Sequence, residues 1–82
     1  MDRQWLDRKL TVAQAEAEHM HDGRPFGRLQ GQWEQMKSQM AEGDELWSFV
    51  SPLDSWRHLA GRAGVALVRN GEIIGHLVTR MN

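Results

Sequence analysis

The sequence predicts an α+β fold in which N-terminal helices pack on a small three-stranded sheet. The Asn70-Gly71 pair lies between two apolar runs, which is typical of a β-hairpin with a two-residue turn. Residues 45–50 alternate between two sets of apolar side chains, as a strand does. Residues 28–42 repeat apolar side chains at helical spacing. At 82 residues the chain is long enough for one domain, and such a domain buries only about 60% of the surface that its unfolded chain exposes.

The N-terminal residues 3–21 are predicted to form a first helix, because they are rich in good helix formers. Its apolar side is thin, so this helix could pack loosely and act as an arm. Two glycines and one proline within residues 22–27 indicate a hinge. We therefore expect an N-terminal helical arm and hinge over residues 1–27 and a single α+β domain over residues 28–82.

The second helix is predicted from a single apolar stripe on residues 28–42. The stripe lies at i, i+4, i+7 and i+11, and its members are Leu29, Trp33, Met36 and Met40. Gly43-Asp44 ends this helix and leads into the strand at residues 45–50.

A short third helix should follow that strand, since Ser51 can cap a helix and Pro52 suits its first position. Gly61 could close this helix in a left-handed conformation. Its inward side chains are expected to be Leu53, Trp56, Leu59 and Ala60. Residues 65–69 and 72–79 then form the two strands of the C-terminal hairpin.

The hairpin turn also predicts which side chains share a face of the sheet. With Asn70-Gly71 as the loop, Leu67 lies opposite Ile74 and Val65 lies opposite His76. One face then carries small side chains on which a helix can dock, namely Gly64, Ala66, Val68, Ile73, Gly75 and Leu77. The other face is too apolar for a solvated surface and carries Val65, Leu67, Ile74, His76 and Val78.

Three candidates could cover this second face: the N-terminal helix, a second copy of the chain, or a different protein. Trp5 lies on the thin first helix and could anchor such an interface. The predicted interaction residues are therefore Trp5, Val65, Leu67, Ile74, His76 and Val78.

Composition argues against several classes of function. Ten Lys and Arg balance eleven Asp and Glu to a net charge of −1, so binding to nucleic acid or to an acidic membrane surface is disfavoured. No apolar run is long enough to cross a membrane, and the chain has no cysteine. A cytoplasmic location is expected from these features.

No catalytic, metal-binding or cofactor-binding residue is expected. His19 and His21 diverge on a helix and have no third ligand nearby. Asp54 and His58 share one short helix with Ser55, which is a poor geometry for nucleophilic catalysis.

Two weaker alternatives concern ligands. A pocket could form near Arg57, His58, Arg62 and His76 and hold a small ligand or substrate. An anion could instead be held by Arg57, Arg62, Arg69 and Arg80. A nucleic-acid binder is a third, weaker alternative, which requires these four arginines on one face.

A set of short motifs runs through the second half of the chain. They are Gly43-Asp44-Glu45-Leu46-Trp47, Ser51-Pro52, Ser55-Trp56, Leu59-Ala60-Gly61-Arg62-Ala63-Gly64, Leu67-Val68-Arg69-Asn70-Gly71 and Met81-Asn82. On these residues the chain resembles a group of short uncharacterised bacterial proteins. The resemblance covers about half of the chain, leaves out residues 1–27, and implies a free-standing small bacterial polypeptide. It brings no known activity, cofactor or catalytic residue with it.

The sequence thus predicts a small non-enzymatic interaction or regulatory protein. It would act through an apolar sheet face, a strand edge or the N-terminal helix. Its partner would be another protein or a second copy, giving a homodimer.

Overall fold

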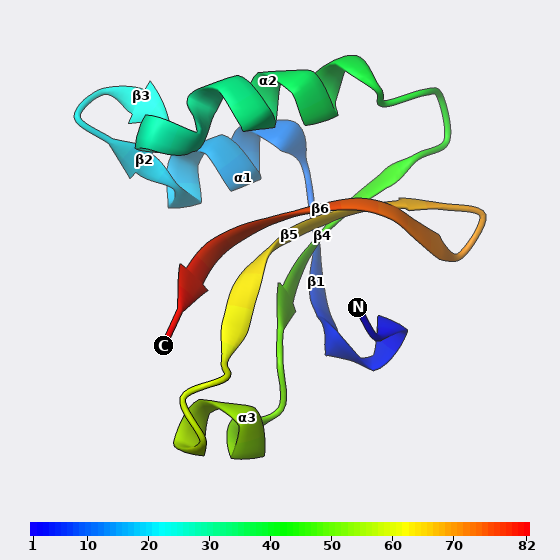
Figure 1. Cartoon of the computed structure of the whole chain (residues 1–82). Coiled ribbons are helices and arrows are strands. Elements are labelled where there is room, and N and C mark those ends of the chain that lie inside the picture. The colour runs from blue at the N-terminus through cyan, green and yellow to red at the C-terminus, as the bar shows by residue number, and fades with distance from the viewer.

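A computed structural model describes all residues, 1–82, and confirms the α+β class. Four antiparallel strands form the main sheet in the order β1-β4-β5-β6. Two helices, α1 and α2, lie on the same side of this sheet, while α3 lies at one end, between β4 and β5 (Figure 1). The Cα atoms span 35 × 34 × 17 Å, so the molecule is a flat slab of one helical layer on one sheet.

The main sheet is built from β1 (Leu6–Leu10), β4 (Glu45–Val50), β5 (Arg62–Arg69) and β6 (Glu72–Met81). A second sheet is a short hairpin of β2 (Met20–His21) and β3 (Arg24–Pro25). The predicted turn joins β5 to β6, since Asn70 and Gly71 have φ angles of 51° and 79°. Positive φ at both positions is the geometry of a type I′ turn.

The helices are α1 (Val12–Glu18), α2 (Gln30–Ser38) and α3 (Leu53–Arg57), with short 3-10 turns η1 (Arg3–Trp5) and η2 (Gly27–Leu29). A capping box begins α1, because the Thr11 hydroxyl accepts from the Gln14 N–H and the Gln14 side chain accepts from the Thr11 N–H. None of these helices has the length and apolar character needed to cross a membrane.

One hydrophobic core lies between the helices and the sheet. Its buried members come from both halves of the chain and are Leu10, Ala15, Phe26, Trp33, Met36, Leu46, Val65, Leu67 and Leu77. Leu29 and Met40 pack against this core, so the predicted stripe on the second helix does face inward. Residues 1–27 supply three members, which places that segment in the same core as residues 28–82.

The prediction of one helix over residues 3–21 is wrong in its first half. Leu6–Leu10 forms the edge strand β1, which pairs with β4 through Leu6–Phe49 and Leu10–Leu46. The predicted three-stranded sheet is therefore four-stranded. The strand reads Leu-Asp-Arg-Lys-Leu and has little strand character of its own, so it depends on pairing with distant residues.

The predicted register of the hairpin is also wrong beyond its first two pairs. Bulges in β6 interrupt the pairing between Ile73 and Gly75 and between Val78 and Arg80. Leu67 therefore lies opposite Gly75 rather than Ile74. Each bulge moves the following residues of β6 to the other face. The helices dock on the face of Val65 and Leu67, and not on the face of Ala66 and Val68 where a helix was expected.

The short third helix differs from its prediction in three details. Pro52 is the N-cap, and no side chain caps the helix. Leu53 and Leu59 are 67% and 76% exposed, so they do not face inward. Leu59, with φ of 58°, takes the left-handed conformation predicted for Gly61. Gly61 has another role, because a Cβ there would overlap the Trp56 ring.

Candidate functional site

The candidate site is the face of the main sheet that no helix covers, which we call the helix-free face. Cross-strand pairing arranges it in three rows that run across the strands. The rows are Leu6–Phe49–Gly64–Val78, Lys9–Trp47–Ala66–His76 and Glu45–Val68–Ile73. Most of these side chains are apolar, whereas the free face of an antiparallel sheet normally carries polar ones.

The middle of this face is closed by its own side chains. Gly64 and Ala66 on β5 leave a trough, and the rings of Phe49 and His76 meet edge to face across it at 6.1 Å between centroids. Phe49, Ala66 and Val68 are buried in consequence, although they lie outside the main core.

The apolar side chains left partly open surround this closed middle. They are half-buried and comprise Leu6, Trp47, Ile73 and Val78. At one border the Glu45 carboxylate accepts from the Trp47 indole N–H at 3.0 Å and pairs with Lys9 at 3.1 Å. These contacts lower the pKa of Glu45, the indole hydrogen bond most strongly. The face is thus an apolar patch with a charged border.

The structure divides the six predicted interaction residues among three places. Val65 and Leu67 are fully buried beneath the helices, so they offer no surface to a partner. His76 and Val78 lie on the helix-free face, and Ile74 is 43% exposed at the first bulge of β6. Trp5 is half-buried in η1.

Sequence reasoning missed Leu6, Trp47 and Ile73 as members of this face. Trp47 and Phe49 were correctly placed on one side of their strand by alternation. Aromatic side chains usually fill cores, which favours an inward position for Trp47, whereas the structure places it on the helix-free face. Leu6 could not be placed because β1 itself was missed.

The four predicted anion-binding arginines do not converge. Arg69 donates two hydrogen bonds of 2.8 Å to the Asp44 carboxylate and a third to the Gln39 carbonyl oxygen. The Asp44 side chain is only 2% exposed. Hydrogen bonds from Arg69, and then from the Ala41 N–H, lower the pKa of Asp44 to about 2. Arg69 is therefore a structural partner of Asp44, and Arg62 lies about 23 Å from it along β5.

The predicted pocket near Arg57, His58, Arg62 and His76 does not assemble either. Arg62 donates to the Gly61 carbonyl oxygen, and His58 bonds the Asp54 carbonyl oxygen at 2.9 Å through Nδ1. His76 lies in the middle of β6, beside Phe49. Of the other two arginines of the anion set, Arg80 stacks over the Trp56 ring at 4.9 Å and Arg57 ends α3.

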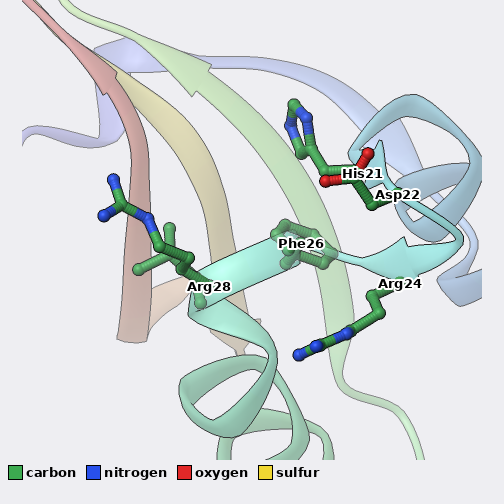
Figure 2. A pocket seen from close by; sticks show the side chains of 7 residues that line it. His21, Asp22, Arg24, Phe26 and Arg28 are labelled. Carbon is green, nitrogen blue, oxygen red and sulfur yellow. The ribbon is translucent and has the colours of Figure 1, made fainter.

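A hollow of about 500 Å³ lies at the β2–β3 hairpin. Figure 2 shows the side chains that line it, with polar groups around Phe26. The guanidinium groups of Arg24 and Arg28 lie apart from one another, and His21 and Asp22 lie at the hairpin turn (Figure 2). An anion needs donors that converge on one point, and this hollow does not supply them.

A second hollow, of about 560 Å³, lies between the end of α1 and the strands β4 to β6. Arg8 and Glu18 on its wall hydrogen-bond each other at 2.8 and 3.3 Å. Their charges are mutually satisfied, so neither is poised to act on a ligand.

The motif residues around α3 have a structural role in this fold. Buried Ser51 accepts a hydrogen bond from the Arg62 N–H through Oγ, and its carbonyl oxygen accepts from the Trp56 indole N–H. The Asn82 side chain accepts from the Gly61 N–H at 2.8 Å and donates to the Trp56 carbonyl oxygen at 2.6 Å. These contacts fasten the end of β6 to α3.

Comparison with known proteins gives no further guide, since no protein family, curated protein or solved structure matches this chain. The resemblance to short bacterial proteins stays a prediction.

Proposed function

We propose that this protein is a non-enzymatic interaction protein whose working surface is the helix-free face. The observation that carries the proposal is the set of half-buried apolar side chains on a sheet face without a helix above it. Contiguous apolar surface on a small protein commonly marks a protein interface. The partner is a protein with an apolar surface of matching shape.

The arrangement of the face fits this use. Its centre is already packed by Phe49 and His76, so a partner would meet a preformed surface and little ordering would be needed. The Lys9–Glu45 pair at the border adds charges of both signs, which favour one orientation of the partner. A cytoplasmic setting and a bacterial origin, both expected from the sequence, remain part of the proposal.

Site-specific photocrosslinking tests this function in cells that express the protein naturally. A photoreactive residue at Trp47 or at Ile73 should capture one and the same partner protein. The control position is Leu53, which is equally apolar and 67% exposed but lies on α3. Val78→Glu should abolish capture while leaving the fold intact by circular dichroism. Equal capture from Leu53, or capture that survives Val78→Glu, would refute the proposal.

A further inference from the structure

The two edges of the main sheet differ in how they are protected. Both edge strands contain bulges, but β1 is only five residues long and carries three consecutive charges at Asp7, Arg8 and Lys9. Such features normally keep an edge from pairing with another strand. The other edge is β6, ten residues long, and residues 73–79 within it carry no Asp, Glu, Lys, Arg or Pro. This edge is open to strand addition.

Charges flank this uncharged stretch of β6 with opposite signs, Glu72 at one end and Arg80 at the other. In an antiparallel pairing of two β6 strands centred on His76, Glu72 lies opposite Arg80 of the partner subunit, and the reverse contact repeats at the other end. Opposite charges that face each other across strands stabilise the pairing. The strand is therefore complementary in charge to a second copy of itself.

Despite the two bulges in β6, the side chains of Glu72 and Arg80 lie on the same face of the sheet. Residues 63, 65, 67 and 69 of β5 alternate onto the helix side of the sheet, together with core residues Val65 and Leu67. Their partners on β6 are Arg80, Leu77, Gly75 and Glu72. Glu72 and Arg80 consequently project from the same face, as a salt bridge between two copies requires.

The β6 residues between Glu72 and Arg80 are also compatible with this antiparallel register. Ile74, which is 43% exposed, would face Val78 of the partner subunit, so an apolar side chain meets another. A hollow of about 240 Å³ runs along this edge between α2 and β6, and its lining includes Gln32, Gln35 and Gln39. An amide side chain both donates and accepts hydrogen bonds, so these glutamines can pair with their own copies.

We propose that the protein forms a two-fold dimer in which β6 pairs antiparallel with β6 of a second copy, centred on His76. The dimer has one eight-stranded sheet with α1 and α2 of both copies on one side, and it joins the two helix-free faces into a single surface. The charged β1 edges remain outside, so the assembly closes at two copies. This pairing uses the strand edge, shares His76 and Val78 with the helix-free face, and leaves Trp47 outside the contact between copies.

Light-scattering chromatography of the full chain tests the dimer, with circular dichroism as the check on folding. The wild-type protein should have the mass of two chains, and Ile74→Lys should convert it to a folded monomer. Leu53→Lys is the matched control, since it also places a lysine at an exposed apolar position, and it should leave the dimer intact.

A charge exchange makes the test specific for the register. Glu72→Arg alone and Arg80→Glu alone should each raise the dimer dissociation constant about tenfold, because each change affects both symmetric contacts. The double variant Glu72→Arg/Arg80→Glu should return the dimer dissociation constant to the wild-type value.

A wild-type monomer, or a dimer that withstands Ile74→Lys, would overturn the inference, as would single and double charge variants that behave alike. Trp47 is not needed for this pairing, so Trp47→Ala should lose the partner captured from position 73 and keep the dimer mass. Each proposal can therefore fail without the other.

Discussion

Gly64 lies where β6 approaches β5 most closely. A Cβ at this position would overlap the Leu77 carbonyl oxygen and would lie 3.0 Å from the Thr79 nitrogen. Both contacts are with backbone atoms next to the second bulge of β6, which cannot move aside as a flexible side chain could. The absence of a side chain here therefore fixes the register that places Val78 on the helix-free face.

Gly64→Ala should destabilise the protein by about 3 kcal/mol, since overpacking against a rigid backbone is costly. Chemical denaturation measures the loss. Gly75→Ala is the matched control on the neighbouring strand, because a Cβ at Gly75 meets nothing within 4 Å. Similar stabilities for the two variants would show that β6 does not approach β5 as described.

Asp44 makes a second prediction at the level of single residues. Its pKa falls from 3.8 to about 2 in the folded protein, so between these values the unfolded chain binds more protons than the folded one. The stability contributed by this carboxylate is complete above pH 3.8 and is lost as the pH falls towards 2. Asp44→Asn should flatten this part of the profile in denaturation experiments at pH 5, 3 and 2. An unchanged slope would contradict the Asp44–Arg69 pair.

At the level of elements, a stack of rings joins the β2–β3 hairpin to α2. His19 stacks on Phe26 at 4.7 Å between centroids, and Phe26 stacks on Trp33 at 4.3 Å. Trp33 in turn donates from its indole to Glu16 of α1, which also pairs with Lys37 of α2 at 2.8 Å. The two helices and the hairpin are thereby fastened into one layer above the sheet.

Burial lowers the pKa of His19 below its usual 6.5, and the neighbouring His21 adds to this while Glu18 opposes it. The folded protein therefore favours the neutral ring. The stability that the neutral His19 ring contributes is fully present above pH 6.5. It declines as the pH falls below that value, because the unfolded chain takes up the proton first. An NMR titration of the His19 ring should give a midpoint below 6.5. A midpoint at or above 6.5 would argue against the stack.

Elements with a local signal could be predicted from the sequence. The strand at residues 45–50 and the Asn70-Gly71 turn were predicted correctly, because alternation and turn chemistry act over neighbouring residues. The strand Leu6–Leu10 was not, because only its pairing with β4 makes it a strand. The bulges were missed for a related reason, since no local pattern marks them; the second lies where β6 approaches Gly64 closely, which is a contact between strands.

The candidate site could be predicted only in part. An apolar sheet face available to a partner was expected, and His76 and Val78 do lie on the helix-free face. The missed bulges exchange the faces of β6 residues, so Leu77 lies beside Val65 on the helix side and His76 lies beside Ala66 on the helix-free face. The helices dock on the side of Val65 and Leu67, which leaves Trp47 of β4 on the helix-free face.

For the whole molecule, the feature that matters for function is that α1 and α2 form one layer on one side of the main sheet (Figure 1). The sheet is left with a packed side and an apolar open side. The proposed function depends on this asymmetry, and the proposed dimer would double the open surface without covering it.

Thiol labelling compares the two sides directly, since the chain has no cysteine of its own. Val65→Cys and Val78→Cys are matched substitutions on opposite faces, the first fully buried beneath the helices and the second on the helix-free face. In the isolated protein, the thiol at position 78 should react at least about 100-fold faster than the thiol at position 65, which requires opening of the core. Addition of the photocrosslinked partner should slow only the reaction at position 78. Equal or reversed rates in the isolated protein, or no protection by the partner, would contradict the central claim that the helices cover one face and leave the other for binding.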